Sequence, residues 1–217
     1  GGGLAKFDGK SWTVYNKENS GLPSDDVRSI IIDAQGNKWI GAWGGGLAVF
    51  DDRSWTVYNT ENSDLLSNDV LSVAIDAQGN KWIGTREGGV AVFDGRSWTV
   101  YNTENSDLPS NYVSSIVIDS QGNKWIGTDR GLVRFDGRSW VVYNRWNSGL
   151  PSDEVTSIAI DSQGNKWIGT DRGLVRFDGR SWVVYNIGNS GLLNVTSVAI
   201  DRWGNKWIGT RGEGLVV

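Results

Sequence analysis

The hexapeptide Gly-Asn-Lys-Trp-Ile-Gly at residues 36–41 occurs five times in this 217-residue chain. Its other copies lie at 79–84, 122–127, 164–169 and 204–209, so successive tryptophans are separated by 43, 43, 42 and 40 residues. Self-similarity at such a period indicates one supersecondary unit that is repeated along the chain. The repeat therefore constrains the architecture before any single residue is assigned a role.

Each repeat contains four short segments with strand character. In the N-terminal part they are residues 4–8, 11–16, 27–33 and 38–42. Two tight turns alternate with two longer polar loops, and in the N-terminal part these turns lie at Asp8-Gly9 and at residues 34–37. We interpret Asp-Gly as the centre of a type I′ hairpin turn, which needs positive φ at both residues. The second copy has Asp51-Asp52, so Asp52 is expected to adopt a left-handed backbone.

The strand at 27–33 has one face of small side chains. Ser29 is matched by serine at 72, 115, 157 and 197, while Ile30 and Ile32 occupy the other face. A small face is suited to an inner strand at which neighbouring elements crowd together. Lys38 and its four counterparts are expected on a solvated face.

About 40–45 residues per four-stranded unit is the period of a propeller blade, and four to eight blades close a ring. We therefore predict an all-β, five-bladed β-propeller with four antiparallel strands per blade, in a single domain over residues 1–217. The chain begins at the third strand of a repeat and ends after the second, followed by 214–217. This register predicts a closing blade shared by the N- and C-termini, in which either 214–217 or the strand at Leu4 is redundant.

Composition excludes several classes of site. The chain has no cysteine, histidine or methionine, a net charge of −4 and no run of basic residues. Nucleic acid is therefore not an expected partner, and no apolar stretch is long enough to insert into a membrane. The repeated aspartates, Asp33, Asp76, Asp119, Asp161 and Asp201, could form metal sites or accept hydrogen bonds from the turns that follow them. We favour the turn interpretation and expect neither a metal nor a cofactor.

Ten of the 13 tryptophans recur at fixed positions of the repeat, so we assign them to the core rather than to a binding surface. The pattern LPSxxVxSIxIDxxGNKWIGTxxGLxxFDG resembles the repeat of the two-component regulator propeller family. That family's members are commonly extracytoplasmic sensor domains of bacterial hybrid histidine kinases, which recognise glycans or other signals. The resemblance implies an extracellular or periplasmic location and supplies no catalytic residue.

The repeats differ mainly in the loops after the WIG strand and between successive repeats. In a blade these two sets of loops lie on the same rim, which we call the variable rim, and loops on a rigid scaffold commonly carry binding residues. Aromatic side chains beside charged ones are typical of a glycan or peptide site, although neutral divergence would also produce such differences. The candidate ligand-binding residues are Trp43, Arg86, Glu87, Tyr112, Asp129, Arg130, Trp146, Asp171, Arg172 and Arg211.

Three functions are compatible with these features. The first is a non-enzymatic binding or sensor module that recognises a carbohydrate or peptide at the variable rim. The second is an amplified or engineered repeat scaffold for protein–protein contact or self-assembly, with a homo-oligomer formed through the terminal strands. The third is a polysaccharide-cleaving propeller that uses a carboxylate pair such as Glu87 and Asp129. No nucleophile–base pair is visible, so we predict that the chain is not an enzyme.

Overall fold

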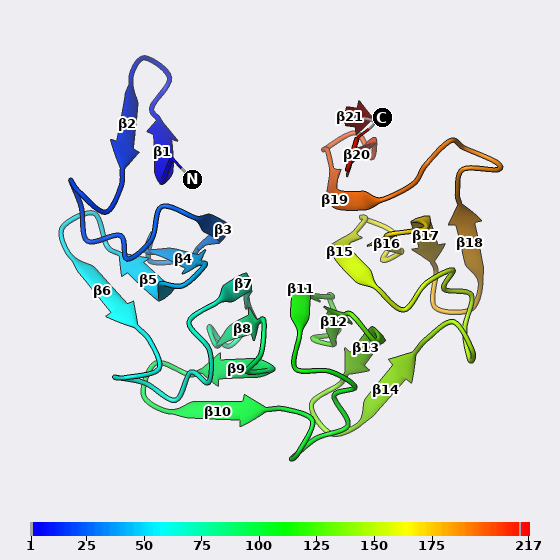
Figure 1. Cartoon of the computed structure of the whole chain (residues 1–217), viewed down its shortest axis with the longest axis horizontal. Coiled ribbons are helices and arrows are strands. Elements are labelled where there is room, and N and C mark those ends of the chain that lie inside the picture. Colours follow the sequence, from blue (N-terminus) through cyan, green and yellow to red (C-terminus); the bar gives the residue numbers. More distant parts are fainter. Residues whose placement is uncertain (1, 213) are drawn as a thin grey trace. The chain divides into compact units, whose positions relative to one another are not determined.

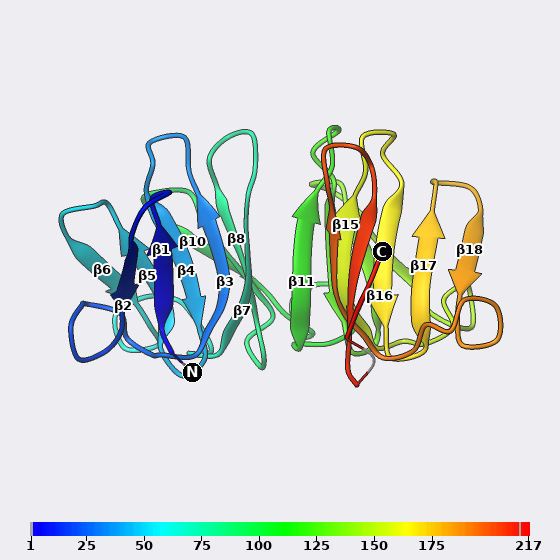
Figure 2. The ribbon, with the colours of Figure 1, turned by 90° about the horizontal axis from the view of Figure 1, so that it is seen from above.

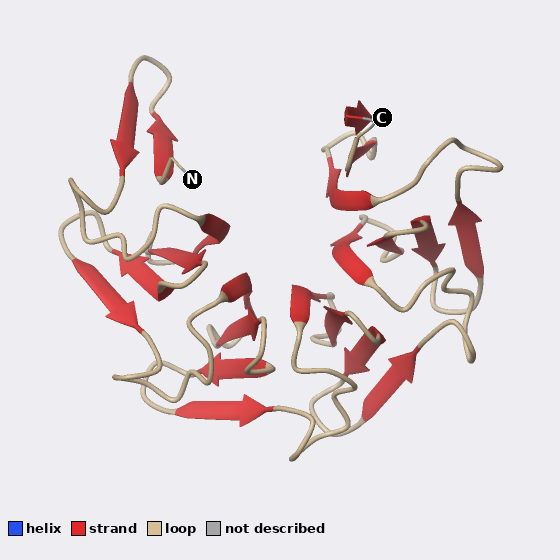
Figure 3. Ribbon diagram, viewed as in Figure 1, coloured by secondary structure: helices blue, strands red, loops and turns tan. Residues whose placement is uncertain are grey.

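The computed structural model describes residues 2–212 and 214–217, and these residues form strands and loops without a helix (Figure 3). The chain divides into two compact units, Gly1–Tyr101 (unit 1) and Asn102–Val217 (unit 2). Neighbouring strands are antiparallel and follow chain order within each sheet. The single-domain assignment of residues 1–217 stays a prediction.

Unit 1 contains a two-stranded sheet followed by two four-stranded sheets (Figure 1). The strands are β1 (Leu4–Phe7) and β2 (Trp12–Tyr15), then β3 (Val27–Ile32), β4 (Lys38–Ala42), β5 (Gly46–Phe50) and β6 (Trp55–Tyr58), then β7 (Val70–Ile75), β8 (Lys81–Thr85), β9 (Val90–Phe93) and β10 (Trp98–Tyr101).

Unit 2 contains two four-stranded sheets followed by a three-stranded sheet. The strands are β11 (Val113–Ile118), β12 (Lys124–Thr128), β13 (Gly131–Phe135) and β14 (Trp140–Tyr143), then β15 (Val155–Ile160), β16 (Lys166–Thr170), β17 (Gly173–Phe177) and β18 (Trp182–Tyr185), then β19 (Val195–Ile200), β20 (Lys206–Thr210) and β21 (Gly214–Val216).

The predicted fold class is confirmed as an all-β, five-bladed β-propeller with four antiparallel strands per blade. The pairing at the C-terminus differs from the expected closing blade. β20 pairs with β21 in the register Ile208↔Val216, so β21 occupies the place on β20 that we had assigned to the N-terminal strand. The short connection between β20 and β21 explains the outcome, because closing a short loop costs less entropy than pairing distant ends of the chain.

The first strand of each repeat is the inner strand, as the small face predicted. β3 packs against β7 in unit 1, and β11, β15 and β19 pack in series in unit 2. The repeated serine joins successive sheets, because its Oγ accepts a backbone N–H from the next inner strand. Val73 N lies 3.0 Å from Ser29 Oγ, and Ile158 N lies 3.1 Å from Ser115 Oγ. Ser29, Ser115 and Ser157 are therefore fixed by a hydrogen bond as well as by size.

The opposite face of the inner strand is buried only where a complete sheet precedes it. Ile158 on β15 is 5% exposed against the β11–β14 sheet, whereas its counterpart Ile30 on β3 is 47% exposed. Only the two-stranded β1–β2 sheet precedes β3 in unit 1. The sequence pattern correctly identified the two faces but could not show that one copy lacks a complete neighbour.

The Asp-Gly hairpins are not the type I′ turns that we predicted. Gly9 has a φ of 95°, whereas Asp8 is not among the residues with positive φ. Asp8 precedes the turn, and its Oδ1 accepts the N–H groups of Lys10 and Ser11 at 2.9 and 2.8 Å. Positive φ at the first central residue alone is the feature of a type II′ turn. The expectation for Asp52 is confirmed, since it takes the glycine position with a φ of 72°.

The aspartate before each Gly-Asn-Lys-Trp segment organises its own turn and the tryptophan beyond it. Oδ1 of Asp119 accepts the backbone N–H groups of Gln121 and Asn123 at 3.0 and 2.9 Å. Its Oδ2 accepts Asn123 Nδ2 and Trp125 Nε1, both at 2.9 Å. This confirms the turn interpretation of the repeated aspartates. The same set of donors recurs at Asp33, Asp76, Asp161 and Asp201.

The expectation that the repeated lysines are solvated is wrong. Lys166 is only 8% exposed, and its Nζ lies 4.7 Å from the ring centroid of Trp125 on the preceding sheet. Lys81 lies in the same way over Trp39, at 4.5 Å. A lysine stem can pack along an aromatic surface while the ammonium is attracted by the ring. Each of these lysines therefore helps to join two sheets.

The turn network leads to a stability prediction for Asp119→Ala. The substitution leaves the buried Trp125 Nε1 and two turn N–H groups without their acceptor, so we expect the free energy of unfolding to fall by roughly 2–3 kcal/mol. Urea denaturation followed by circular dichroism measures the change. Asp107→Ala, at an exposed loop position, is the control and should change stability by less than about 0.5 kcal/mol. Equal effects of the two substitutions would contradict the role of the network.

The same carboxylates predict a loss of stability in acid. Burial alone raises the pKa of Asp119, but the hydrogen bonds from Trp125, Asn123 and Gln121 together outweigh it and hold the pKa below the ordinary 3.8. A folded-state pKa below the unfolded value stabilises the protein above the unfolded pKa, and this stability is lost as pH falls through the folded pKa. We therefore expect the free energy of unfolding to decrease as pH falls below 3.8.

The measurement is urea denaturation at a series of pH values between 6 and 2, a range chosen around the ordinary carboxyl pKa. Asp119→Asn should show a smaller decrease over this range than the unaltered protein, because one titrating carboxylate is gone. An identical pH dependence in both proteins would remove Asp119 from the explanation.

Candidate functional site

In each unit, the two kinds of loop lie at opposite ends of the strands (Figure 2). The tight hairpins, such as β11–β12 and β13–β14, lie at one end, which we call the hairpin rim. The connections within a sheet such as β12–β13, and those between sheets such as β14–β15, lie at the other end because the strands are antiparallel. This second end is the variable rim, and it carries the ten candidate residues.

In unit 1 the variable rim is organised around Trp43, directly after β4. The backbone N–H of Trp43 donates to the carbonyl oxygen of Asp26 at 2.9 Å. The guanidinium carbons of Arg28 and Arg86 lie 5.1 and 4.8 Å from the ring centroid. Two cations that are far apart in the sequence therefore meet at one indole, which makes the surface polar rather than apolar.

Two aspartates hold this group in place. Arg28 Nη2 lies 2.7 Å from Asp26 Oδ2, and Arg86 Nη1 lies 3.8 Å from Asp69 Oδ2. Asp69 also accepts the N–H of Gly44 through its Oδ1 at 2.8 Å and the N–H of Arg86 through its carbonyl oxygen at 3.0 Å. The side chains of Arg28 and Arg86 are nevertheless each 45% exposed. The site can thus offer N–H donors to an external acceptor.

The structure adds Arg28 to the predicted residues. Arg28 lies on β3, at a position that is Leu71 in the next repeat, and comparing strand positions as well as loops would have found it. Glu87 follows Arg86 and is exposed.

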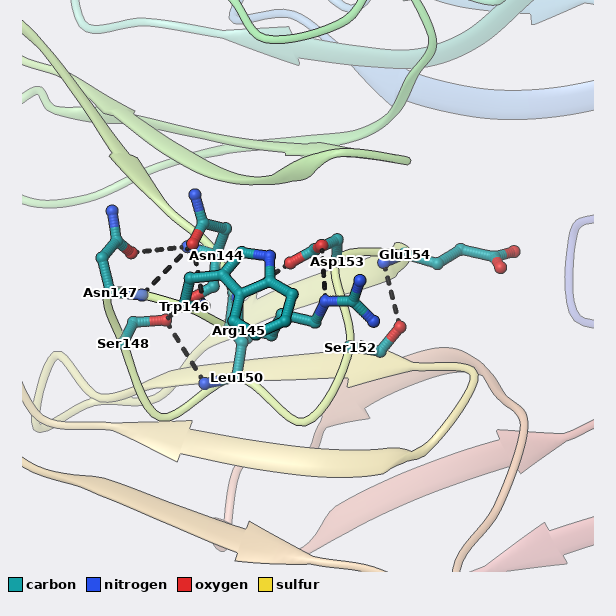
Figure 4. A network of polar contacts seen from close by, with 9 residues as sticks. All are labelled: Asn144, Arg145, Trp146, Asn147, Ser148, Leu150, Ser152, Asp153 and Glu154. Atoms are coloured by element: carbon teal, nitrogen blue, oxygen red, sulfur yellow. Dashed lines mark hydrogen bonds and ion pairs between the residues drawn. The ribbon is translucent and has the colours of Figure 1, made fainter.

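In unit 2 the most accessible candidate is Trp146, in the loop between β14 and β15. Its side chain is 80% exposed. Two asparagine side chains hold the loop backbone. Asn144 Oδ1 accepts the backbone N–H of Trp146 at 2.9 Å, and Asn147 Oδ1 accepts the backbone N–H of Asn144 at 2.8 Å (Figure 4). The indole therefore projects from a fixed loop.

Arg145 completes this surface. Its guanidinium carbon lies 4.6 Å from the ring centroid of Trp146. Asp153 fixes Arg145 by accepting its backbone N–H at 2.8 Å and by an ion pair with Nε at 3.4 Å (Figure 4). The loop between β2 and β3 in unit 1 has the same backbone hydrogen bonds, with Glu18 in place of the tryptophan. One loop conformation thus presents different side chains.

Asp171 and Arg211 are connected through the backbone of Asn194. The Asn194 N–H donates to the carbonyl oxygen of Asp171, and the Asn194 carbonyl oxygen accepts the backbone N–H of Arg211, both at 2.9 Å. Oδ1 of Asp171 is buried and has no hydrogen-bond partner within the described part of the chain. Arg172 is exposed, and its N–H donates to Thr170 Oγ1 at 3.2 Å. The end of the β16–β17 connection is therefore ordered by backbone bonds, with the Arg172 side chain facing solvent.

Tyr112 is half-buried, and its N–H donates to Ser110 Oγ at 3.0 Å. Asp129 and Arg130 are exposed after β12. Among the described residues, no hydrogen bond or ion pair joins Asp129 or Arg130 to Trp146. The candidates of unit 2 thus lie on one rim without forming a single hydrogen-bonded cluster.

Two further features concern residues 2–212 and 214–217. This part of the chain holds no group of three Asp or Glu side chains placed to bind a metal ion. It also has no helix of the length and apolar character needed to cross a bilayer.

A cavity of about 680 Å³ lies on the hairpin rim of unit 2, between the β11–β14 and β15–β18 sheets. Its walls include Trp125, Arg134 and Lys166. The candidate residues predicted from the sequence all lie on the variable rim, so this cavity was not expected. The available signal was Arg134, which replaces Val49 at the equivalent strand position of the second repeat.

Residues 107–130 and 149–172 match the family model of the two component regulator propeller. These are two component regulator propeller repeats. The match confirms the resemblance that the repeat pattern indicated. A comparison with curated proteins finds no match for this chain.

Solved structures of low sequence identity share the fold. The extracellular domain of a putative hybrid two component system from B. thetaiotaomicron is 24% identical, with a TM-score of 0.68 over 99% of this chain and 36% of that chain. PorZ, a surface component of the type-IX secretion system of Porphyromonas gingivalis, is 20% identical, with a TM-score of 0.72 over 97% and 36% of the two chains.

An ancestral GH74 enzyme is 16% identical, with a TM-score of 0.72 over 99% of this chain and 33% of that chain. This chain therefore spans about a third of the length of each of these structures. At such identities the similarity shows the fold, and the propeller fold hosts both binding modules and enzymes.

Proposed function

We propose that this chain is a non-enzymatic binding or sensor module that recognises a carbohydrate or peptide at the variable rim. The observation that carries the proposal is Trp146, whose indole is 80% exposed on a loop held by its own hydrogen bonds. A large aromatic side chain fixed in this way loses little conformational entropy when a ligand packs against it. Arg145 beside it supplies N–H donors for the ligand's oxygen atoms.

The comparisons support a sensor role and an extracellular or periplasmic location. The matching family model is that of a regulator propeller, and one neighbour is the extracellular domain of a putative hybrid two component system. Because one structural neighbour is a GH74 enzyme, a glycoside-cleaving function is the alternative to a sensor role. The carboxylates considered for that function, Glu87 and Asp129, are both exposed and belong to different units.

A second candidate is protein–protein contact through β21. This strand lies at the edge of its sheet, and its neighbouring side chains Leu215 and Val217 are 63% and 69% exposed. An exposed apolar edge strand is a surface on which another chain can pair. Light scattering should then show concentration-dependent homo-oligomers, and Leu215→Lys should shift them toward the monomer.

Binding at the variable rim is tested by glycan and peptide arrays, followed by calorimetric titration of any ligand found. Trp146→Ala should weaken binding about tenfold or more, which corresponds to ~1.4 kcal/mol. Trp203→Ala is a matched control, because Trp203 is 72% exposed, has Arg202 4.1 Å from its ring centroid and lies on the hairpin rim of the same unit. The control should bind like the unaltered protein.

Two results would contradict the proposal. One is the absence of any array ligand together with oligomers by light scattering, which would favour the protein-contact function. The other is equal weakening by Trp146→Ala and Trp203→Ala, which would separate binding from the variable rim.

A further inference from the structure

The cavity between the β11–β14 and β15–β18 sheets has the dimensions of a small-molecule site. Its volume is about 680 Å³, within the roughly 300–1,000 Å³ that ligand pockets occupy. The rings of Trp125, Tyr143 and Phe177 form part of its wall, and Gln121 and Gln163 contribute amide groups from two hairpins. Aromatic walls with a few polar groups are the usual lining of such sites.

Arg134 contributes a cation whose Nη2 lies 3.7 Å from Asp136 Oδ2 and whose Nε is an unmatched donor. It is the cross-strand partner of Trp125, so both side chains lie on the same face of the sheet. Trp125 contacts Phe177 at a centroid distance of 5.9 Å, and this face therefore looks toward the β15–β18 sheet. Arg134 Nε is buried and has no hydrogen-bond partner among the described residues. A buried donor without an acceptor is unfavourable unless a ligand or water supplies one.

Lys166 contributes a second cation to the same cavity. The residue is 8% exposed, and the described contact of its ammonium is the ring of Trp125 at 4.7 Å. Two of its counterparts have oxygen partners: Lys38 pairs with Asp52, and Lys206 Nζ donates to the carbonyl oxygen of Gly204 at 2.6 Å. Within the described residues, Lys166 has no hydrogen bond or ion pair to an oxygen atom.

Three carboxylates in the cavity wall are already engaged by their own turns. Asp119 and Asp161 accept turn N–H groups and the indoles of Trp125 and Trp167, and Asp178 accepts Ser181 Oγ at 2.6 Å. Among the described residues no ion pair joins these carboxylates to Lys166 or Arg134, but their negative charges remain. The lining therefore offers two cationic donors and still opposes a ligand with more than one negative charge.

We propose that this cavity binds a small hydroxylated monocarboxylate, whose carboxylate is held by Lys166 and Arg134. Its hydroxyl groups face the amides of Gln121 and Gln163, and its body packs against the aromatic wall. A carboxylate accepts the strong hydrogen bonds that a guanidinium and an ammonium donate. This site is separate from the variable rim and does not depend on the function proposed there.

Three probes with the same sugar ring test the assignment: glucose is neutral, glucuronate carries one negative charge, and glucose 6-phosphate carries nearly two at pH 7.5. Calorimetric titration of the whole chain should show glucuronate binding at least tenfold tighter than either of the others. In ¹⁵N spectra, glucuronate should shift the indole N–H signal of Trp125 and leave that of Trp146 unchanged.

Arg134→Val should weaken glucuronate binding at least tenfold. Valine is the native residue at the equivalent positions Val49 and Val92, so the sheet tolerates it. Arg176→Val is the matched control: Arg176 has the same strand position in the next repeat and also has a buried, unpartnered Nε, but it does not line this cavity. The control should bind within twofold of the unaltered protein.

Lys166→Met keeps an unbranched stem over Trp125, removes the charge, and should also weaken binding at least tenfold. If Arg134→Val fails to fold, Lys166→Met and the Trp125 signal still decide the question. The proposal is overturned if glucuronate binds no tighter than glucose or if glucose 6-phosphate binds more tightly. It is also overturned if Arg176→Val is as damaging as Arg134→Val, or if the Trp125 signal does not move.

Discussion

The hydrogen bonds that one aspartate accepts from its own turn and from a tryptophan six residues later determine how each sheet meets the next. Asp119 fixes the turn through two backbone N–H groups and orients Trp125 through its indole N–H. Trp125 then packs against Phe177 of the following sheet, just as Trp39 packs against Phe93 in unit 1. Because a buried indole N–H needs an acceptor, the carboxylate and the ring are required together.

The structural role of the repeated aspartates and tryptophans explains why the most repeated residues are not the candidates for binding. Their polar groups are hydrogen-bonded within the repeat, and their rings pack between sheets. The loop that carries Trp146 has the backbone bonds of the loop that carries Glu18, so a change of side chain leaves the frame intact. Binding capacity lies in side chains that the frame does not use.

Much of the fold could be predicted from the sequence, because the period of the repeat and the alternation along the inner strand are local signals. The strand at Lys38–Ala42 was predicted at its observed bounds, and Asp52 was predicted in its left-handed conformation. The prediction for the Asp-Gly turn was wrong because the Asp8 side chain accepts the N–H groups of Lys10 and Ser11 and so precedes the turn. The prediction for Lys166 was wrong because its aromatic partner, Trp125, lies on another sheet. The closing strand pair was wrongly predicted because β20 pairs with β21 through a short connection. The variable rim could be located in the same way, but Arg28 and the cavity depend on which side chains the packed sheets bring together.

The cavity shows most clearly why sequence identity between repeats does not fix function. Arg134 and Arg176 belong to the fourth and fifth copies of the same repeat segment, both of which read GLVRFDGRSWVVYN. Arg134 faces a complete four-stranded sheet, whose Lys166 lacks an oxygen partner among the described residues, whereas the sheet after Arg176 has three strands and its Lys206 donates to Gly204. The same arginine therefore lines a cavity with an unmatched cation in one place and not in the other. A binding site in a repeat protein can thus arise from the neighbour that a repeat meets, even when the repeats themselves are alike.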